Sequence, residues 1–205
     1  MKRYGWLALV LVAAIAGTAK GQEVVFEDSF DGKLGPDWAW LRETEGGWRI
    51  AGGALEIRVV PGLAETVKNA LVRPAPHRSK GRYAIEVTVS NPTAPIQQYE
   101  QAGITWYSGG KPVFKLVKEL IDGAIYTIPG KVALSGNSVR LRLVVSGEDW
   151  TAQFRAEGEA EFKTAATGKL PPPGEDQVSL QCYNGPPEAE HWIRFDDFRI
   201  TRVGQ

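Results

Sequence analysis

Two glutamates are the residues of this sequence best placed to act as acid and base. Glu100 lies in the stretch QYEQAGITWY and Glu119 in VFKLVKEL, with the turn-forming residues SGGKP between them. If these stretches pair as antiparallel strands, Glu100 and Glu119 approach each other, and two carboxyl groups about 5–9.5 Å apart are the usual requirement for hydrolysing a glycosidic bond. The simpler interpretation, which we favour, is an ion pair between Glu119 and Lys115, four residues earlier on the same face.

The histidines and the remaining sequence patterns give little further support for catalysis. His77 lies in a loop flanked by prolines and is expected to be solvated. His191 begins the last predicted strand, where it is either a site residue or, in the interpretation we favour, an ordinary strand-end residue. The sequence contains neither a Gly-x-Ser-x-Gly nucleophile motif nor potential ligands at the spacing of a catalytic zinc site. An enzyme is therefore less favoured than a non-catalytic protein.

Apolar residues alternate with polar ones at a period of two along most of the chain. In GRYAIEVTVS, for example, Tyr83 and Ile85 share one face, and the same alternation occurs in SVRLRLVVSG, WTAQFRA and QVSLQCY. Turn-forming residues separate these stretches and predict two hairpins, one closed by Asp122-Gly123 and one closed around Gly147. Many short strands with regular turns predict an all-β jelly-roll sandwich of two antiparallel sheets.

A polar face on these strands is the candidate binding surface. In QAGITWY, Ala102 and Trp106 are expected in the core, which turns Gln101 and Tyr107 to the opposite face. Amides, charges and tyrosines suit saccharides, because hydroxyl groups pair with multi-donor side chains and aromatic rings stack on sugar C–H faces. Gly103, inside the strand, marks a close approach by either a ligand or a neighbouring backbone. The candidate carbohydrate-binding residues are Gln101, Tyr107, Lys115, Glu119, Arg140, Gln181 and Tyr183.

Acidic residues near both ends of the predicted domain suggest a structural cation. In VVFEDSF, Asp28 shares a face with two phenylalanines, and in WIRFDDFRI the apolar period breaks at Asp196-Asp197, which predicts a β-bulge. If the first and last strands are neighbours, Asp28 converges with Asp197 or Asp196, and carboxylate and carbonyl oxygens are the ligands that calcium prefers. The favoured alternative is a salt bridge to Arg199 or Arg49, or turn capping. No cofactor other than this calcium is expected.

The composition and the N-terminus limit the classes of protein. Residues 1–21 begin with Lys2 and Arg3, continue with an apolar run and end in small residues, which is typical of a secretory signal peptide. We expect one domain over residues 22–205, exported to the periplasm or the cell exterior, with no membrane span. The chain has 24 basic and 24 acidic residues and no basic cluster, so no nucleic-acid partner is expected. Cys182 is the only cysteine, and we expect a buried thiol.

Four motifs resemble a known domain family. FEDSFDGKLGPDWAW, GGWRIAGGALEIRV, QYEQAGITWY and IRFDDFRI, in this order, resemble the concanavalin A-like domain found at the C-terminus of beta-xylosidases and as a free-standing secreted module. The closing strand also resembles that of the keto-disaccharide hydrolase family, which shares the lectin/glucanase jelly roll. The resemblance implies a two-sheet sandwich whose concave face meets carbohydrate, and it supplies no catalytic residues.

We therefore expect a secreted carbohydrate-binding or accessory module that acts on glycans through one polar sheet face. One alternative is a glycoside hydrolase or polysaccharide lyase that uses Glu100 or Glu119. The other is a purely structural interaction domain.

Overall fold

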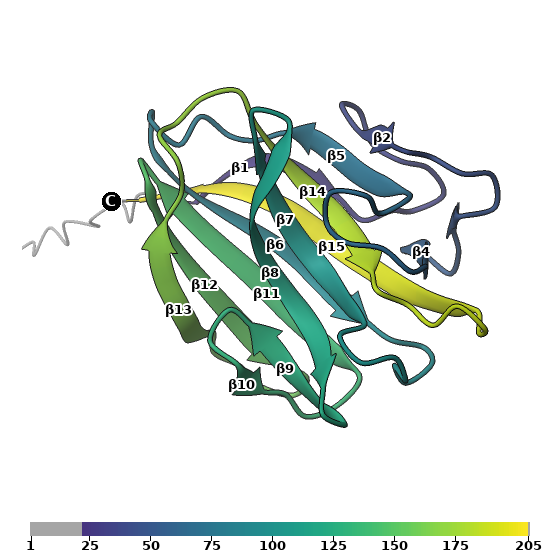
Figure 1. The fold of residues 1–205 in the computed structure, drawn as a ribbon. Helices are drawn as coiled ribbons and strands as arrows, with labels where there is room; N and C mark the ends of the chain where they lie inside the picture. Colours follow the sequence, from purple (N-terminus) through teal and green to yellow (C-terminus); the bar gives the residue numbers. More distant parts are fainter. Residues whose placement is uncertain (1–21, 205) are drawn as a thin grey trace, which may run out of the picture.

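The structure is a computed structural model that describes residues 22–204, and these form a sandwich of two antiparallel sheets (Figure 1). The predicted all-β jelly roll is confirmed. We call the layer nearer the viewer in Figure 1 the front sheet and the other the back sheet. The front sheet contains β2 (Ala39–Leu41), β5 (Ala70–Pro74), β7 (Gln101–Ser108), β8 (Lys111–Ile121), β9 (Ala124–Ile128), β10 (Val132–Ala133) and β14 (Asp176–Tyr183). The back sheet contains β1 (Glu23–Asp28), β3 (Trp48–Ile50), β4 (Leu55–Val59), β6 (Arg82–Ser90), β11 (Ser138–Ser146), β12 (Asp149–Ala156), β13 (Lys163–Lys169) and β15 (His191–Val203).

The strand order explains how distant parts of the sequence meet. The front sheet runs β10-β9-β8-β7-β14-β5-β2, and the back sheet runs β13-β12-β11-β6-β15-β4-β3, with β1 also paired to β15. The chain therefore crosses between the sheets several times, as in a jelly roll. In the middle of the front sheet, β7 lies between β8, its neighbour in sequence, and β14, which comes about 70 residues later. These three strands carry most of the candidate binding residues.

The turns follow the residue types that the sequence supplies. Asp122 and Gly123 connect β8 to β9 with positive φ values of 51° and 79°, the combination that a tight two-residue hairpin requires. Gly147 lies between β11 and β12, where Ser146 pairs with Asp149. Both predicted hairpins are confirmed.

The hydrophobic core lies between the sheets and is built by the alternation seen in the sequence. Ala102, Ile104 and Trp106 of β7 are buried against the back sheet, as predicted. Cys182 of β14 is also fully buried, and loss of hydration raises the pKa of its thiol. The thiol is therefore a packing group, in agreement with the prediction.

A β-bulge lets both halves of β15 contribute to the core. The register of β15 against β6 shifts between Asp196 and Arg199, at the predicted position. Phe195 and Phe198, one on each side of the shift, are both buried. The predicted pairing of the first and last strands is also confirmed, with Asp28 opposite Phe198.

The predicted signal peptide, residues 1–21, lies outside the described residues. Among residues 22–204, no helix has the length and apolar character to cross a membrane.

Candidate functional site

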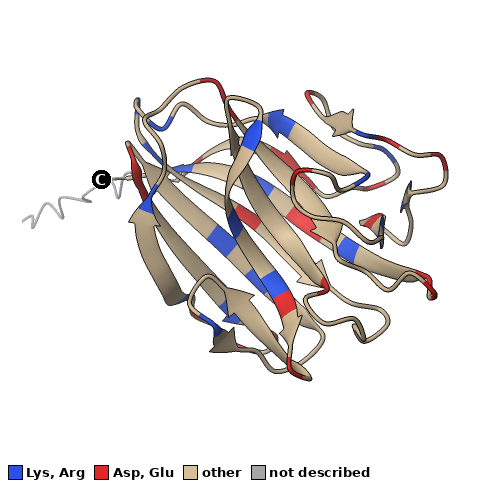
Figure 2. Cartoon of the chain, viewed as in Figure 1, with Lys and Arg blue, Asp and Glu red and all other residues tan. Residues whose placement is uncertain are grey.

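The outer face of the front sheet gathers six of the seven candidate binding residues. The strand register places Gln101 of β7 opposite Glu119 of β8 on one side and Tyr183 of β14 on the other. Gln181, two residues before Tyr183, and Lys115, four residues before Glu119, lie on the same face. Charged residues are few along these strands of the front sheet (Figure 2). We call this surface, formed by the outward residues of β7, β8 and β14, the front face.

Three side chains at one end of the front face form a closed polar network. The Lys115 ammonium lies 2.6 Å from Gln101 Oε1 and 3.3 Å from Glu119 Oε2. The Gln101 amide donates to Glu119 Oε1 at 3.3 Å and to the carbonyl of Tyr99 at 2.9 Å. The predicted Lys115–Glu119 ion pair is confirmed. The Lys115 side chain is 36% exposed and that of Glu119 only 8%, so Lys115 is the more solvent-exposed of the two.

The other end of the front face is covered by a loop and is not exposed to solvent. The Tyr107 hydroxyl lies 3.0 Å from the carbonyl of Ala64 and 3.0 Å from Gln181 Oε1, so it bridges the sheet to the loop between β4 and β5. Burial raises the pKa of Tyr107. Tyr183 packs with Val67 of the same loop. Sequence alternation predicted an exposed polar face, but this loop, residues 60–69, covers the β14 half of it.

Two buried polar atoms beneath this cover have no protein partner among the described residues. They are the amide nitrogen of Gln181 and the hydroxyl of Thr105. The carbonyl of the same Gln181 amide accepts from Tyr107 and from Ser179 at 3.1 Å, so only its donor side is unpaired. Buried donors normally pair with acceptors. The unpaired donors of Gln181 and Thr105 therefore leave this part of the face able to form further hydrogen bonds.

Gly103 is explained by the neighbouring strand and not by a ligand. A Cβ atom at this position would collide with the backbone carbonyl of Leu116 and lie 2.8 Å from the Cα of Val117. It would also lie 2.9 Å from a methyl group of Leu141 in the opposite sheet. Close backbone packing, one of the two predicted explanations, therefore accounts for the glycine.

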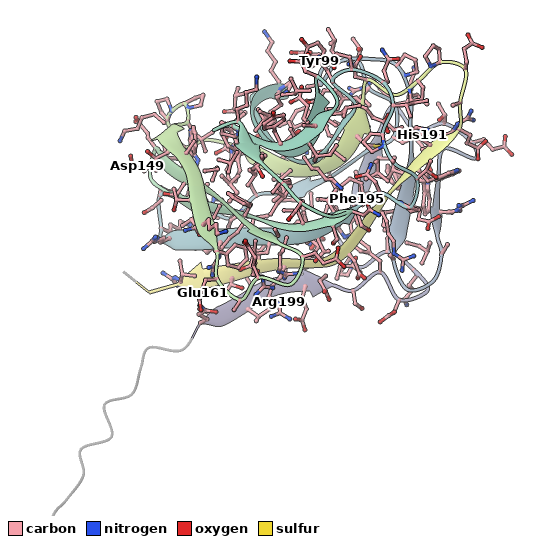
Figure 3. The ribbon with its side chains drawn as sticks, turned by 90° about the horizontal axis from the view of Figure 1, so that it is seen from below. Tyr99, Asp149, Glu161, His191, Phe195 and Arg199 are labelled. Carbon is pink, nitrogen blue, oxygen red and sulfur yellow. The ribbon has the colours of Figure 1, made fainter. Side chains whose placement is uncertain are left out.

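Tyr99, at the rim of the front face, is a candidate that sequence reasoning missed. Its side chain is 50% exposed, and its φ of 67° lies in the left-handed region, which is unusual for a bulky residue. Gln98 and Asp122 hold the segment through two hydrogen bonds of 2.9 and 3.0 Å, and Asn184 donates to the Gln98 carbonyl at 2.8 Å. Figure 3 shows Tyr99 on the outer side of the front sheet. The residues around Tyr99 do not predict its exposure, because the turn that carries it is held by a hydrogen bond between Gln98 and Asp122, which are 24 residues apart in sequence.

Glu100 points into the sandwich and not toward Glu119. Its carboxylate contacts Nδ1 of His191 at 3.0 and 3.2 Å, and His191 belongs to the back sheet. It also accepts from the backbone N–H groups of Ile96 and Gln97. Glu119 pairs with Gln101, the residue after Glu100, and successive residues of a strand point to opposite faces. The two candidate acids therefore lie on opposite faces of the front sheet. His191 is buried and, like Phe195, lies between the layers (Figure 3), whereas His77 is exposed as predicted.

Arg140 is the one candidate binding residue that the structure separates from the others. It lies on β11 of the back sheet, where its guanidinium contacts Glu86 at 2.9 Å and Thr88 at 3.0 Å. Alternation predicted correctly that Arg140 points away from the core. It does not reveal which of the two sheets a strand joins, and this is why the grouping with Gln101 was wrong.

Of the three acids considered for calcium, Asp28 and Asp197 have separate hydrogen-bond or charge partners. Asp28 accepts three hydrogen bonds of 2.8 Å, from the backbone N–H groups of Phe30 and Gly35 and from the Trp38 indole. Asp197 is exposed and lies 3.7 Å from Arg140. No group of three or more potential metal-ligating side chains is found within residues 22–204. Asp28 caps the loop that follows β1, yet it borders one pocket together with Asp197, and the calcium site stays a prediction.

Comparisons with known proteins relate this chain to others by fold. No family model matches the sequence, and no curated protein matches it. The GH43 protein BlXynB from Bacillus licheniformis superposes with a TM-score of 0.68 at 20% identity, over 86% of this chain and 39% of that one. The xylan beta-1,4-xylosidase from Bacillus halodurans C-125 gives a TM-score of 0.63 at 17% identity, with the same coverage. This chain therefore spans well under half of these two proteins.

A third similar structure matches over nearly its whole length. It is the CBM2 module of the evolved Dit protein of Lactobacillus casei BL23 phage J-1, with a TM-score of 0.59 at 11% identity. The match covers 90% of this chain and 98% of the module. At such identities the likeness establishes the shared jelly-roll fold.

Proposed function

We propose that this chain is a carbohydrate-binding or accessory module that contacts glycans through the front face. The observation that carries the proposal is the Gln101–Lys115–Glu119 network, in which Gln101 also contacts the backbone of the exposed Tyr99. Such a site offers donors and acceptors to sugar hydroxyls and a ring on which a pyranose stacks. The resemblance to beta-xylosidase C-terminal domains, and the xylosidase and CBM2 module among the similar structures, support this choice of ligand.

Binding is favoured over hydrolysis or elimination by the positions of the two candidate acids. Both are buried, but Glu119 lies on the front face beside the partly exposed Lys115, whereas Glu100 lies between the sheets and pairs with His191. A saccharide on the front face would meet one carboxylate only, and glycoside hydrolysis generally uses two that flank the scissile bond. We therefore assign Glu119 to hydrogen bonding and Glu100 to the stability of the fold.

The proposal includes export. The pattern of residues 1–21 favours a cleaved signal peptide ahead of a single domain, residues 22–205. Sequencing the N-terminus of protein recovered from the periplasm or the medium tests this, and an intact Met1 would contradict it.

A glycan-array screen followed by product analysis tests the function. We expect binding to one or more glycans without turnover, and a roughly fivefold loss of affinity in Gln101→Ala, because each neutral hydrogen bond contributes about 1 kcal/mol. The matched control is Gln153→Ala, which removes the same side chain from β12 of the back sheet and should bind normally. Turnover that is lost in Glu119→Gln would overturn the proposal in favour of an enzyme.

A further inference from the structure

A pocket lies apart from the Gln101–Lys115–Glu119 network and shares no residue with it. It has a volume of about 370 Å³ and is bordered by the start of β1, the end of β15 and the residues that follow β5. Because β1 and β15 belong to the back sheet and β5 to the front sheet, the pocket lies between elements of the two layers. Small-molecule sites typically measure about 300–1,000 Å³, so this pocket suits one small ligand.

A buried guanidinium without hydrogen-bonding partners borders this pocket. The side chain of Arg73 is 8% exposed, and its Nε and Nη1 atoms have no acceptor within residues 22–204. Its closest carboxylate is that of Asp37, 4.0 Å from Nη2, which is beyond hydrogen-bond distance. The guanidinium carbon lies 3.1 Å from the centre of the Phe26 ring, so the ring covers one face of the group and leaves its edge to be satisfied.

The charges around Arg73 do not neutralise it locally. Asp28 is nearby, but both of its oxygens already accept hydrogen bonds from other N–H groups. Desolvation lowers the pKa of Arg73 to about 10, while Asp37 and Asp28 act in the opposite direction, so the group is charged at neutral pH. A buried cation whose donors lack acceptors is costly. Arg78, the other buried arginine among the described residues, avoids that cost, because it contacts Asp176 at 2.9 Å and the carbonyl of Pro171 at 2.6 Å.

We propose that this pocket binds a small organic carboxylate, held by the Arg73 guanidinium with help from Arg202 and His77. The planar fork of a guanidinium matches the two oxygens of a carboxylate, and such charge-assisted pairs are among the stronger hydrogen bonds. Arg202 and His77 also border the pocket and add donors, while Glu23 is the one acid on its border.

The walls indicate what the carboxylate is attached to. Phe26, Pro74, Pro76 and Ile200 contribute apolar surface, whereas a site for a free inorganic anion would be lined by donors on several sides. A carboxylate borne on a compact ring fits both features. Uronic acids and simple aromatic acids share this chemistry, and the size of the pocket allows one ring.

Calorimetric titration of the full chain with glucuronate, benzoate, glucose and inorganic sulfate tests the proposal. Glucuronate or benzoate should bind at least about tenfold more tightly than glucose and sulfate, because only they combine a carboxylate with a ring. Tighter binding of glucuronate than of benzoate would identify a sugar acid as the type of ligand. Tighter binding of benzoate would identify an apolar acid. Equal binding of glucose and glucuronate, stronger binding of sulfate, or no binding would overturn the proposal.

Substitutions locate the site. Arg73→Met keeps most of the side-chain volume and should weaken binding of the preferred acid at least about tenfold. Arg202→Gln, at an exposed position, should weaken it by a smaller factor and remains informative if Arg73→Met does not fold. Arg58→Gln, an exposed arginine of β4 outside this pocket, is the matched control and should bind normally. Unchanged binding in both Arg73→Met and Arg202→Gln would also overturn the proposal. Gln101→Ala, on the front face, should leave binding of the acid unchanged, and this result would show that the two sites are separate.

Discussion

The two faces of the β7–β8 pair carry similar side chains that meet different environments. On the inner side, Glu100 contacts His191 and Lys118 donates to the carbonyl of Asn137, and both are buried. On the outer side, Glu119 and Lys115 contact each other and Gln101; Glu119 and Gln101 are buried too, but the lysine is partly exposed. A carboxylate and an ammonium from the same two strands thus maintain the fold on one face and form a candidate ligand network on the other.

The difference shows that the role of a polar residue in a strand depends on the environment of its side chain. An acid that is buried and paired across the two sheets is best explained by stability, because its removal leaves a partner unsatisfied. An acid within a partly exposed network has partners that a ligand can share or replace. Substitutions on the inner side should therefore change stability, and those on the outer side should change binding.

The largest expected effect comes from the inner carboxylate. Glu100→Ala should lower the free energy of unfolding by about 3 kcal/mol, because His191 and two backbone N–H groups lose their acceptor. Urea denaturation measures this change. Glu119→Ala, on the outer face, is the matched control and should cost less, about 1 kcal/mol, since its partner Lys115 is partly exposed and can regain hydration. Equal losses in the two variants would remove the distinction between the faces.

A smaller effect comes from the pH dependence of the inner lysine. Desolvation lowers the pKa of Lys118 to about 8, whereas an unfolded chain holds a lysine near its ordinary value of about 10.4. Between these values the unfolded state binds more protons, so stability should rise with pH, by about 2 kcal/mol up to pH ~10. Above that range the raised pKa values of Tyr107 and Tyr183 oppose the trend.

Denaturation curves between pH 7 and ~10 measure this rise. Lys118→Met should abolish it, and Lys115→Met on the outer face should not. A rise that persists in Lys118→Met would show that another group titrates.

The smallest expected change concerns the rim of the front face. Tyr99→Gly should leave stability within about 1 kcal/mol, because glycine accepts the left-handed conformation but gains entropy in the unfolded chain. It should weaken glycan binding roughly tenfold through loss of the stacking ring. Val24→Ala, at a similarly exposed apolar residue of the back sheet, should leave binding unchanged. Normal binding by Tyr99→Gly would exclude a stacking role for this residue.

Much of the fold follows from local patterns in the sequence. Alternation placed Trp106 and Cys182 in the core, Asp122-Gly123 identified a hairpin, and the broken period at Asp196-Asp197 identified the bulge. These features depend on neighbouring residues, whose geometry fixes the direction of each side chain.

The site was less predictable because it depends on contacts between distant segments. Alternation assigned Arg140 an outward direction but not a sheet, and it gave no sign that Ala64 and its loop cover Tyr107. The exposure of Tyr99 depends on Asp122, and the role of Glu100 depends on His191, 91 residues away. Arg73 appears in the sequence as an ordinary strand residue, and only the packing of β1 against β5 reveals its unsatisfied donors.

The most direct test of the front face as a glycan-binding surface is NMR mapping with an oligosaccharide selected by the array. Backbone and side-chain shifts of the isotope-labelled protein should change at Tyr99, Gln101, Lys115 and Glu119, and the strands β11 and β12 of the back sheet should stay unperturbed. Perturbations confined to the back sheet, or none with any glycan, would contradict the account.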